Sequence, residues 1–197
     1  MEQKLHNRRR RVPQAGFSLM EGMAVLGVMT LLLVMVTQIF AISYDAFAKQ
    51  SARANNDAGA MLGARAISEA ARGATEVLTS HTINGTNYTS SSTTLVLKLP
   101  AVNTSGGIVA DAYDYIAVYR SATDATKIFA DTEPNASSYR VSGQKLVTAY
   151  NDTLTFRYDN PNIAEANRVS VYIRNEQVVR TTTVKTEAWS SIFLRNR

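Results

Sequence analysis

The chain has 197 residues, enough for one modest domain, and its lack of cysteine excludes a disulfide framework and a thiolate metal site. Its formal net charge of +5 is concentrated near the amino end, because residues 1–16 carry five basic residues and one acid, which leaves 16 basic and 15 acidic residues elsewhere. A nucleic-acid-binding surface needs clustered lysine and arginine on the folded body, so the sequence predicts no clear nucleic-acid face.

A long uncharged apolar run follows the basic segment. Residues 22–42 contain no Asp, Glu, Lys, Arg or His. At about 1.5 Å per residue, a helix of this length crosses a bilayer core of about 30 Å. The arginines at positions 8–11 are expected to stay in the cytoplasm by the positive-inside rule. The sequence therefore predicts a single-pass membrane protein, with a cytoplasmic amino terminus and an extracytoplasmic carboxy-terminal domain.

Three interpretations of this run are open. A cleaved secretory signal peptide has an apolar core of roughly 7–15 residues, whereas this run is longer and has an acid, Glu21, at its entrance. A plain signal anchor explains the length and the arginines but leaves Glu21 without a role. The third interpretation gives this acid a role, and it depends on the residues directly before it.

The segment GFSLME, residues 16–21, resembles the class III leader of type IV pilins and type II secretion pseudopilins. In that family a prepilin peptidase cleaves after the leader's last glycine, on the cytoplasmic side, and the new first residue becomes N-methylated. The resemblance implies a prepilin leader over residues 1–16, cleavage between Gly16 and Phe17, N-methylation of Phe17 and an assembly and register role for Glu21. In the family, the acid meets the terminal amine of a neighbouring subunit, so a carboxylate within the filament is paired.

The helix is expected to continue beyond the membrane. The segment GARAISEAARGATEVL, residues 63–78, has apolar residues at steps of three and four, with arginine and glutamate at the same steps on the opposite side. This pattern predicts an amphipathic helix whose apolar stripe packs on a sheet and whose charged face is solvated. We therefore expect a transmembrane and filament-core helix over 17–43 and its amphipathic continuation over 44–78, with either a bend or an interruption considered at the polar run of residues 55–59.

Alternation of apolar and polar residues predicts strands downstream. The clearest are residues 153–158 and 168–174, with a turn beginning at residues 159–162. Weaker strand candidates are residues 95–99, 115–119, 145–150 and 177–184, whereas the polar segments 79–94 and 103–107 are expected to be loops. A helix followed by many antiparallel strands predicts an α+β fold, with the helix packed on the antiparallel sheet of a β-rich domain over 79–197.

This order of elements also resembles, more narrowly, the J-type minor pseudopilins of type II secretion and the W-type minor pilins of type IV pili. The resemblance is carried by LTFRY at 154–158, VSVYI at 169–173 and LRN at 194–196. It implies a low-abundance subunit at or near the filament tip, whose partners are other pilin or pseudopilin subunits, the prepilin peptidase and the membrane assembly platform. Two features depart from the family: MEGM at 20–23 is less aliphatic than usual, and no cysteine pair can close the disulfide loop of a major pilin.

Side chains suited to catalysis are scarce. The two histidines, His6 and His81, and the absence of cysteine exclude Cys/His nucleophile pairs and multi-histidine zinc sites, and His81 is expected to be solvated in a loop. Asp111 and Asp114 are weak candidates for a calcium site, and surface solvation is the simpler interpretation. We expect no enzyme activity and no cofactor. The expected function is that of a structural subunit of a pilus or pseudopilus; the alternative is a membrane-anchored extracytoplasmic binding domain that never polymerises.

Overall fold

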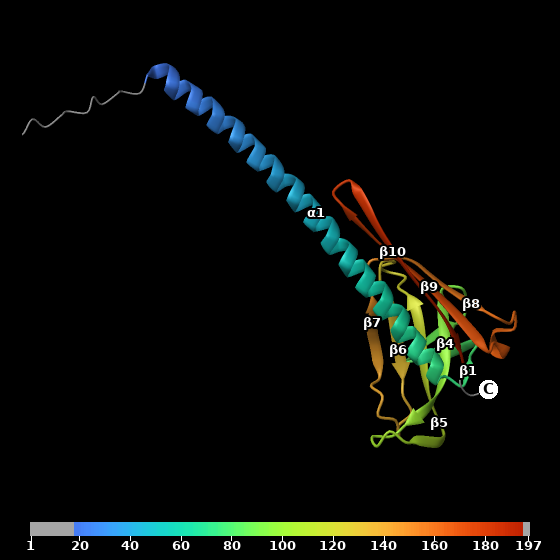
Figure 1. Ribbon diagram of the computed structural model, residues 1–197. Helices are drawn as coiled ribbons and strands as arrows, with labels where there is room; N and C mark the ends of the chain where they lie inside the picture. Colours follow the sequence, from blue (N-terminus) through green and yellow to red (C-terminus); the bar gives the residue numbers. More distant parts are fainter. Residues whose placement is uncertain (1–17, 195–197) are drawn as a thin grey trace, which may run out of the picture. The chain divides into compact units, whose positions relative to one another are not determined.

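The computed structural model describes residues 18–194 and contains one long helix followed by a β-rich region. The helix, α1 (Leu19–Gly73), is apolar in its first half and packs against antiparallel strands in its second half, which confirms the predicted α+β fold (Figure 1). The chain divides into two compact units, Met1–Ala46 and Phe47–Arg197. The strands and the second half of α1 belong to the second unit.

The strands of this unit form three antiparallel sheets. One has the strand order β1-β4-β5-β6-β7, a second has the order β10-β9-β8, and the third is the hairpin β2-β3. The bounds are β1 (Glu76–Val77), β2 (Ser80–Ile83), β3 (Thr86–Thr89), β4 (Thr94–Val102), β5 (Ile108–Arg120), β6 (Ile128–Glu133), β7 (Gly143–Thr148), β8 (Asn151–Tyr158), β9 (Arg168–Val179) and β10 (Thr182–Phe193). A short 3-10 helix, η1 (Ile163–Glu165), lies between β8 and β9.

The main core lies where α1 meets the two larger sheets. The helix contributes Ala60, Ala64, Ile67 and Ala71, whose spacing of three and four residues places them on one face. The sheets contribute large aliphatic and aromatic side chains: Leu95, Leu97, Leu99, Val118 and Ile128 from the five-stranded sheet, and Leu154, Phe156, Val169, Val171, Ile173 and Ile192 from the three-stranded sheet. Small residues on the helix opposite large residues on the sheets allow close packing, and each large side chain that is buried contributes roughly 1.5–3 kcal/mol.

The opposite face of the five-stranded sheet is covered by the hairpin β2-β3. Ile83 packs there on Val96 and Ala117, which alternate along β4 and β5 with the residues that face α1. The hairpin turn is formed by Asn84 and Gly85, whose φ angles of 49° and 81° suit a two-residue turn with two left-handed residues. The expectation of a loop over 79–94 is therefore wrong, and the Asn-Gly pair is the signal that indicated a hairpin.

α1 approaches the sheets most closely at two glycines. A Cβ atom on Gly59 would lie 3.0 Å from Asn175 Nδ2 and Thr148 Oγ1, and one on Gly63 would lie 3.3 Å from Ile173 Cδ1. Asn56, one turn before, is buried and donates its Nδ2 hydrogen bond to the Val184 carbonyl at 3.1 Å. The polar run at residues 55–59 thus serves this contact, and α1 continues through it, so the interruption considered there is wrong.

The helix ends earlier than predicted. α1 stops at Gly73 rather than at residue 78, and Glu76 and Val77 form β1 by pairing with Lys98 and Leu97. The backbone leaves the helix because both the amide and the hydroxyl of Thr75 donate hydrogen bonds to the Lys98 carbonyl, at 2.9 and 3.1 Å.

The clearest strand predictions are confirmed by β8 and β9, and the weaker ones at 95–99 and 115–119 by β4 and β5. The strand expected at 145–150 corresponds to β7, which ends at Thr148. The strand expected at 177–184 is wrong, because this segment contains the turn between β9 and β10, where Arg180 has a φ of 54°. Strand β6 and most of β10 were not predicted.

A hydroxyl from β8 connects the two larger sheets. Tyr158 donates hydrogen bonds to the carbonyls of Ser91 and Thr94, at 3.0 and 3.2 Å, just before and at the start of β4. Burial raises the pKa of Tyr158 well above its ordinary value. The phenol therefore stays protonated and available as a donor across the physiological pH range.

Replacing Gly63 with valine is expected to lower the free energy of unfolding by about 1–3 kcal/mol, because the added side chain has no space beside Ile173 and Thr148. Urea unfolding of the full chain in detergent, followed by circular dichroism, measures the change. The control is Ala58→Val at an exposed position of the same helix, which is expected to cost only about 0.5 kcal/mol through helix propensity. Equal losses in the two variants would contradict the close packing at Gly63.

Candidate functional site at the amino end of the helix

The first half of α1 presents an exposed apolar surface. Every residue from Leu19 to Tyr44 is exposed except Gly22, which is intermediate. An 18-residue window of α1 has a mean hydropathy of 2.5, and no residue of that window is buried. Exposure of such a large apolar surface to water is unfavourable. The length and composition of the segment are compatible with a single-pass membrane anchor.

The two threonine hydroxyls within this segment are satisfied by the helix itself. Thr30 Oγ1 donates to the Leu26 carbonyl at 2.7 Å, and Thr37 Oγ1 donates to the Val34 carbonyl at 2.9 Å. Such local bonds let hydroxyls lie in hydrocarbon without an unpaired donor. A Cβ atom on Gly22 or on Gly27 would meet nothing within 4 Å, so neither glycine is required by a contact within the chain.

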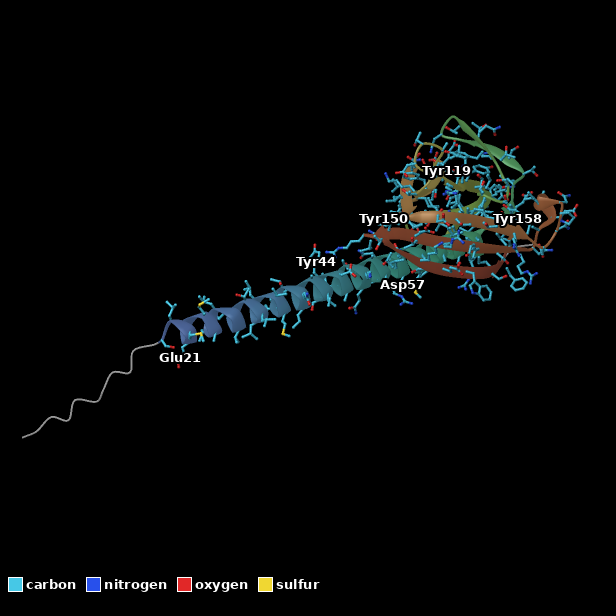
Figure 2. All side chains as sticks on the ribbon, turned by 90° about the horizontal axis from the view of Figure 1, so that it is seen from above. Glu21, Tyr44, Asp57, Tyr119, Tyr150 and Tyr158 are labelled. Atoms are coloured by element: carbon cyan, nitrogen blue, oxygen red, sulfur yellow. The ribbon has the colours of Figure 1, made fainter. Side chains whose placement is uncertain are left out.

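Glu21 lies in the first turn of α1 and forms a capping box with Ser18 (Figure 2). The Glu21 amide donates to Ser18 Oγ at 3.2 Å, and the Ser18 amide donates to Glu21 Oε2 at 3.4 Å. These reciprocal bonds satisfy two of the amides that a helix amino terminus leaves without partners, and the negative charge is favourable at that end of the helix dipole. The sequence reasoning overlooked this role, although the Ser-x-x-Glu spacing indicates it.

The carboxylate of Glu21 is exposed and, within residues 18–194, forms no ion pair. Gly16 and Phe17, the predicted cleavage site and methylated residue, lie outside the described residues. Of the three residues in the predicted processing and assembly motif, the structure therefore describes Glu21 alone. This residue lies between the basic segment and the apolar helix in the sequence. There, a negative charge can be held by the helix terminus or by a cation from another chain.

The two aspartates considered for calcium do not form one site. Asp114 is buried, and its carboxylate accepts hydrogen bonds from the Asn135 amide and Ser138 Oγ, both at 2.7 Å. The same carboxylate forms an ion pair with Arg140. Asp111 is exposed, with a φ of 55°. Within residues 18–194, no three His, Cys, Asp or Glu side chains are grouped as metal ligands would be. Asp114 instead connects β5 to the segment between β6 and β7.

His81 is not in a loop. It lies in β2, is partly buried, and its ring stacks on that of Tyr115 with 3.8 Å between the centroids. The expectation of a solvated loop histidine is therefore wrong. The aromatic contact gives His81 a packing role between the hairpin and the five-stranded sheet.

No protein-family model, no curated protein and no solved structure matches this chain. Any assignment of function must therefore be argued from the residues and the structure described above.

Replacing Asp114 with asparagine is expected to lower the free energy of unfolding by about 2 kcal/mol, because Arg140 loses its counter-charge. The loss is smaller than for a fully buried pair, since the Arg140 side chain remains 23% exposed. Thermal unfolding of the full chain measures it, and Asp111→Asn is the control with an expected change within about 0.5 kcal/mol. A calcium-dependent stabilisation lost in both variants would instead support a shared metal site.

Replacing Ser18 with alanine is expected to weaken the first turn of α1 by about 1 kcal/mol, because the side-chain acceptor for the Glu21 amide is removed. Glu21→Gln should weaken it less, since glutamine can replace glutamate in a capping box. Amide hydrogen exchange of the first turn, in lipid nanodiscs, measures both changes. Ser43→Ala, within the same helix, should leave that turn unaltered; a first turn insensitive to Ser18→Ala would contradict the capping role.

Proposed function

We propose that the chain is a minor pilin or pseudopilin, a non-enzymatic subunit that is processed after Gly16 and assembled into a type IV pilus or a type II secretion pseudopilus. The observation that carries the proposal is the exposed apolar half of α1, which directly follows the GFSLME segment and continues into the helix that supports a β-rich domain. The segment resembles a prepilin processing site, and the apolar surface needs partners from outside the chain.

The apolar half has two suitable environments. Before assembly, the bilayer surrounds Leu19 to Ile42 and the arginine-rich segment stays on the cytoplasmic side. During assembly, the same surface exchanges lipid for the helices of neighbouring subunits, so no large apolar area is exposed to water at either stage. A helix that is exposed over this whole length is compatible with both environments.

Glu21 would give the assembled helices a register. A carboxylate enclosed by apolar helices costs several kcal/mol unless a cation pairs with it, and the amine created at Phe17 of a neighbouring subunit is such a cation. In the single chain, Glu21 accepts a hydrogen bond from the Ser18 amide at 3.4 Å, a long and weak contact. The acid is therefore held at the helix terminus before assembly and can change to a stronger, charged partner in the filament.

The remaining properties follow from this assignment. The protein would be inserted in the inner membrane with the carboxy-terminal domain outside the cytoplasm, and its partners would be other subunits, the prepilin peptidase, the assembly platform and the lipid bilayer. A place at or near the tip follows only from the resemblance to J-type and W-type subunits.

A non-polymerising, membrane-anchored binding domain is the second candidate. The observation that favours it is the capping box, because it gives Glu21 a role within one chain that requires no filament. In this case residues 1–16 would remain attached, and the charge of Glu21 would be unimportant as long as the helix terminus is capped.

Two variants separate these functions. Under the filament proposal, Glu21→Gln keeps the cap but removes the charge, and filament incorporation should fall at least about tenfold, equivalent to 1.4 kcal/mol. Ser18→Ala weakens the cap but keeps the charge, and incorporation should stay within about twofold. Immunoblotting of sheared filaments against membrane fractions measures incorporation, and intact mass with amino-terminal sequencing shows whether the chain begins at methylated Phe17. A chain that begins at Met1, with both variants behaving like the wild type, would favour the anchored domain.

A further inference from the structure

Strand β10 is the outer strand of its sheet, and half of its backbone groups point away from that sheet. The sheet order is β10-β9-β8, and β10 pairs with β9 from Thr182–Val179 to Phe193–Arg168. Just beyond the strand, the Leu194 amide donates to the Asn167 carbonyl at 2.9 Å. Because hydrogen-bonded pairs alternate along an antiparallel ladder, even-numbered residues of β10 bond to β9, and odd-numbered residues direct N–H and C=O to the free edge.

This edge is open, whereas the opposite edge of the same sheet is closed. On β8, the Asn151 amide donates to the Thr126 carbonyl and the Phe156 amide donates to the Ser92 carbonyl, both at 2.8 Å. Among the described residues, no backbone hydrogen bond reaches the odd-numbered positions of β10. The second half of this strand, residues 188–193, also lacks the charged residues and prolines that commonly prevent an edge from pairing.

A groove runs along this open edge, between β10 and the second half of α1. One part, of about 650 Å³, is lined by helix residues from Met61 to Arg72 and by residues 187–190 of β10. The next part, of about 580 Å³, is lined by Glu69, Arg72 and Gly73 and by residues 191–194. A hydrogen bond of 3.0 Å between Ser68 Oγ and Ser190 Oγ joins the two walls. Both walls belong to the second compact unit.

We propose that this groove binds an extended segment of a partner protein, which adds to the three-stranded sheet as a strand beside β10. Main-chain hydrogen bonds to the odd-numbered residues supply a contact that only a polypeptide strand can provide. The groove has a helix as its second wall, so it suits a single extended segment better than the edge of a second folded copy. The proposal does not depend on filament assembly, because an anchored domain can use the same groove.

The side chains around the groove indicate the chemistry of that segment. Trp189 and Phe193 are 80% and 69% exposed on the outer face of the sheet, so apolar residues of the added strand would cover them on that face. On the helix wall, Arg65 pairs with Glu69 at 2.8 Å, whereas Arg72 forms no ion pair with a described residue. The partner segment therefore carries apolar residues on alternate positions and an acidic group, a side chain or a terminal carboxylate, near Arg72.

Hydrogen exchange read at single residues tests the inference on the full chain. The chain is compared in native membranes, where its partners are present, and after purification in detergent. In the membranes, the amides of Glu187, Trp189, Ser191 and Phe193 are expected to exchange about tenfold more slowly, whereas even-numbered amides and β8 should change little. This alternation distinguishes strand addition from a side-chain contact on Trp189.

Ser191→Pro removes one outward amide and leaves the backbone hydrogen bonds to β9 in place, so it should abolish the added protection. Ser191→Ala is the matched control, because it loses the same hydroxyl contact with Ser170 of β9 but keeps the amide, and it should retain the protection. Should the proline variant fail to fold, Arg72→Glu on the helix surface provides the second variant, with an expected loss of most of the protection. Unchanged odd-numbered amides in membranes, or protection that survives both variants, would overturn the proposal. Protection that instead develops in the purified chain with rising concentration would identify a second copy as the occupant and also overturn it.

Discussion

The close contact of the second half of α1 with two sheets is the constraint on which the rest of the domain depends. Small residues on one helix face let the backbone approach the sheets, and the large side chains opposite fill the intervening space. Because both sheets contribute to this one core, neither has a complete apolar interior without the helix. Within the described part of the chain, the apolar residues in the first half of the same helix have no such buried face, and this contrast supports the proposed role in assembly or anchoring.

Under the proposed function, Glu21 serves two interactions at different stages. In the single chain it completes the helix terminus with Ser18, through bonds that are exposed to solvent and weak. In an apolar filament, the same carboxylate would need a cation and would select the position where one is present. Because the capping bonds are weak, little free energy is lost when the carboxylate exchanges the Ser18 amide for the cation.

Periodicity predicted the parts of the fold that bury one face. Residues 153–158 and 168–174 alternate clearly because β8 and β9 have a core face and a solvent face, and α1 shows its apolar stripe at residues 67 and 71. Periodicity failed where contacts between distant segments determine the local structure. The chain leaves the helix at Thr75, which bonds to the Lys98 carbonyl. In β10, several inward positions are serine or threonine, so the alternation of apolar and polar residues is weak. At the candidate site, the Ser-x-x-Glu spacing indicates the capping box, although the sequence analysis did not predict it. The burial of Asp114 could not be predicted, because its partners lie 21 to 26 positions away in the sequence.

The buried asparagines beside Gly59 have a mechanical consequence. Asn56 donates to the Val184 carbonyl, and Asn175 Nδ2 donates to the Asn56 carbonyl at 3.2 Å, among helix positions otherwise occupied by Ala52, Ala60 and Ala64. A slide of one helical turn, about 5.4 Å, would bring an alanine methyl to the Val184 carbonyl in place of the Asn56 side-chain amide and remove that hydrogen bond. The Asn56 side chain thus favours one axial position of the helix in the domain, and a pulling force along α1 must break its bond to Val184 before the helix can slip.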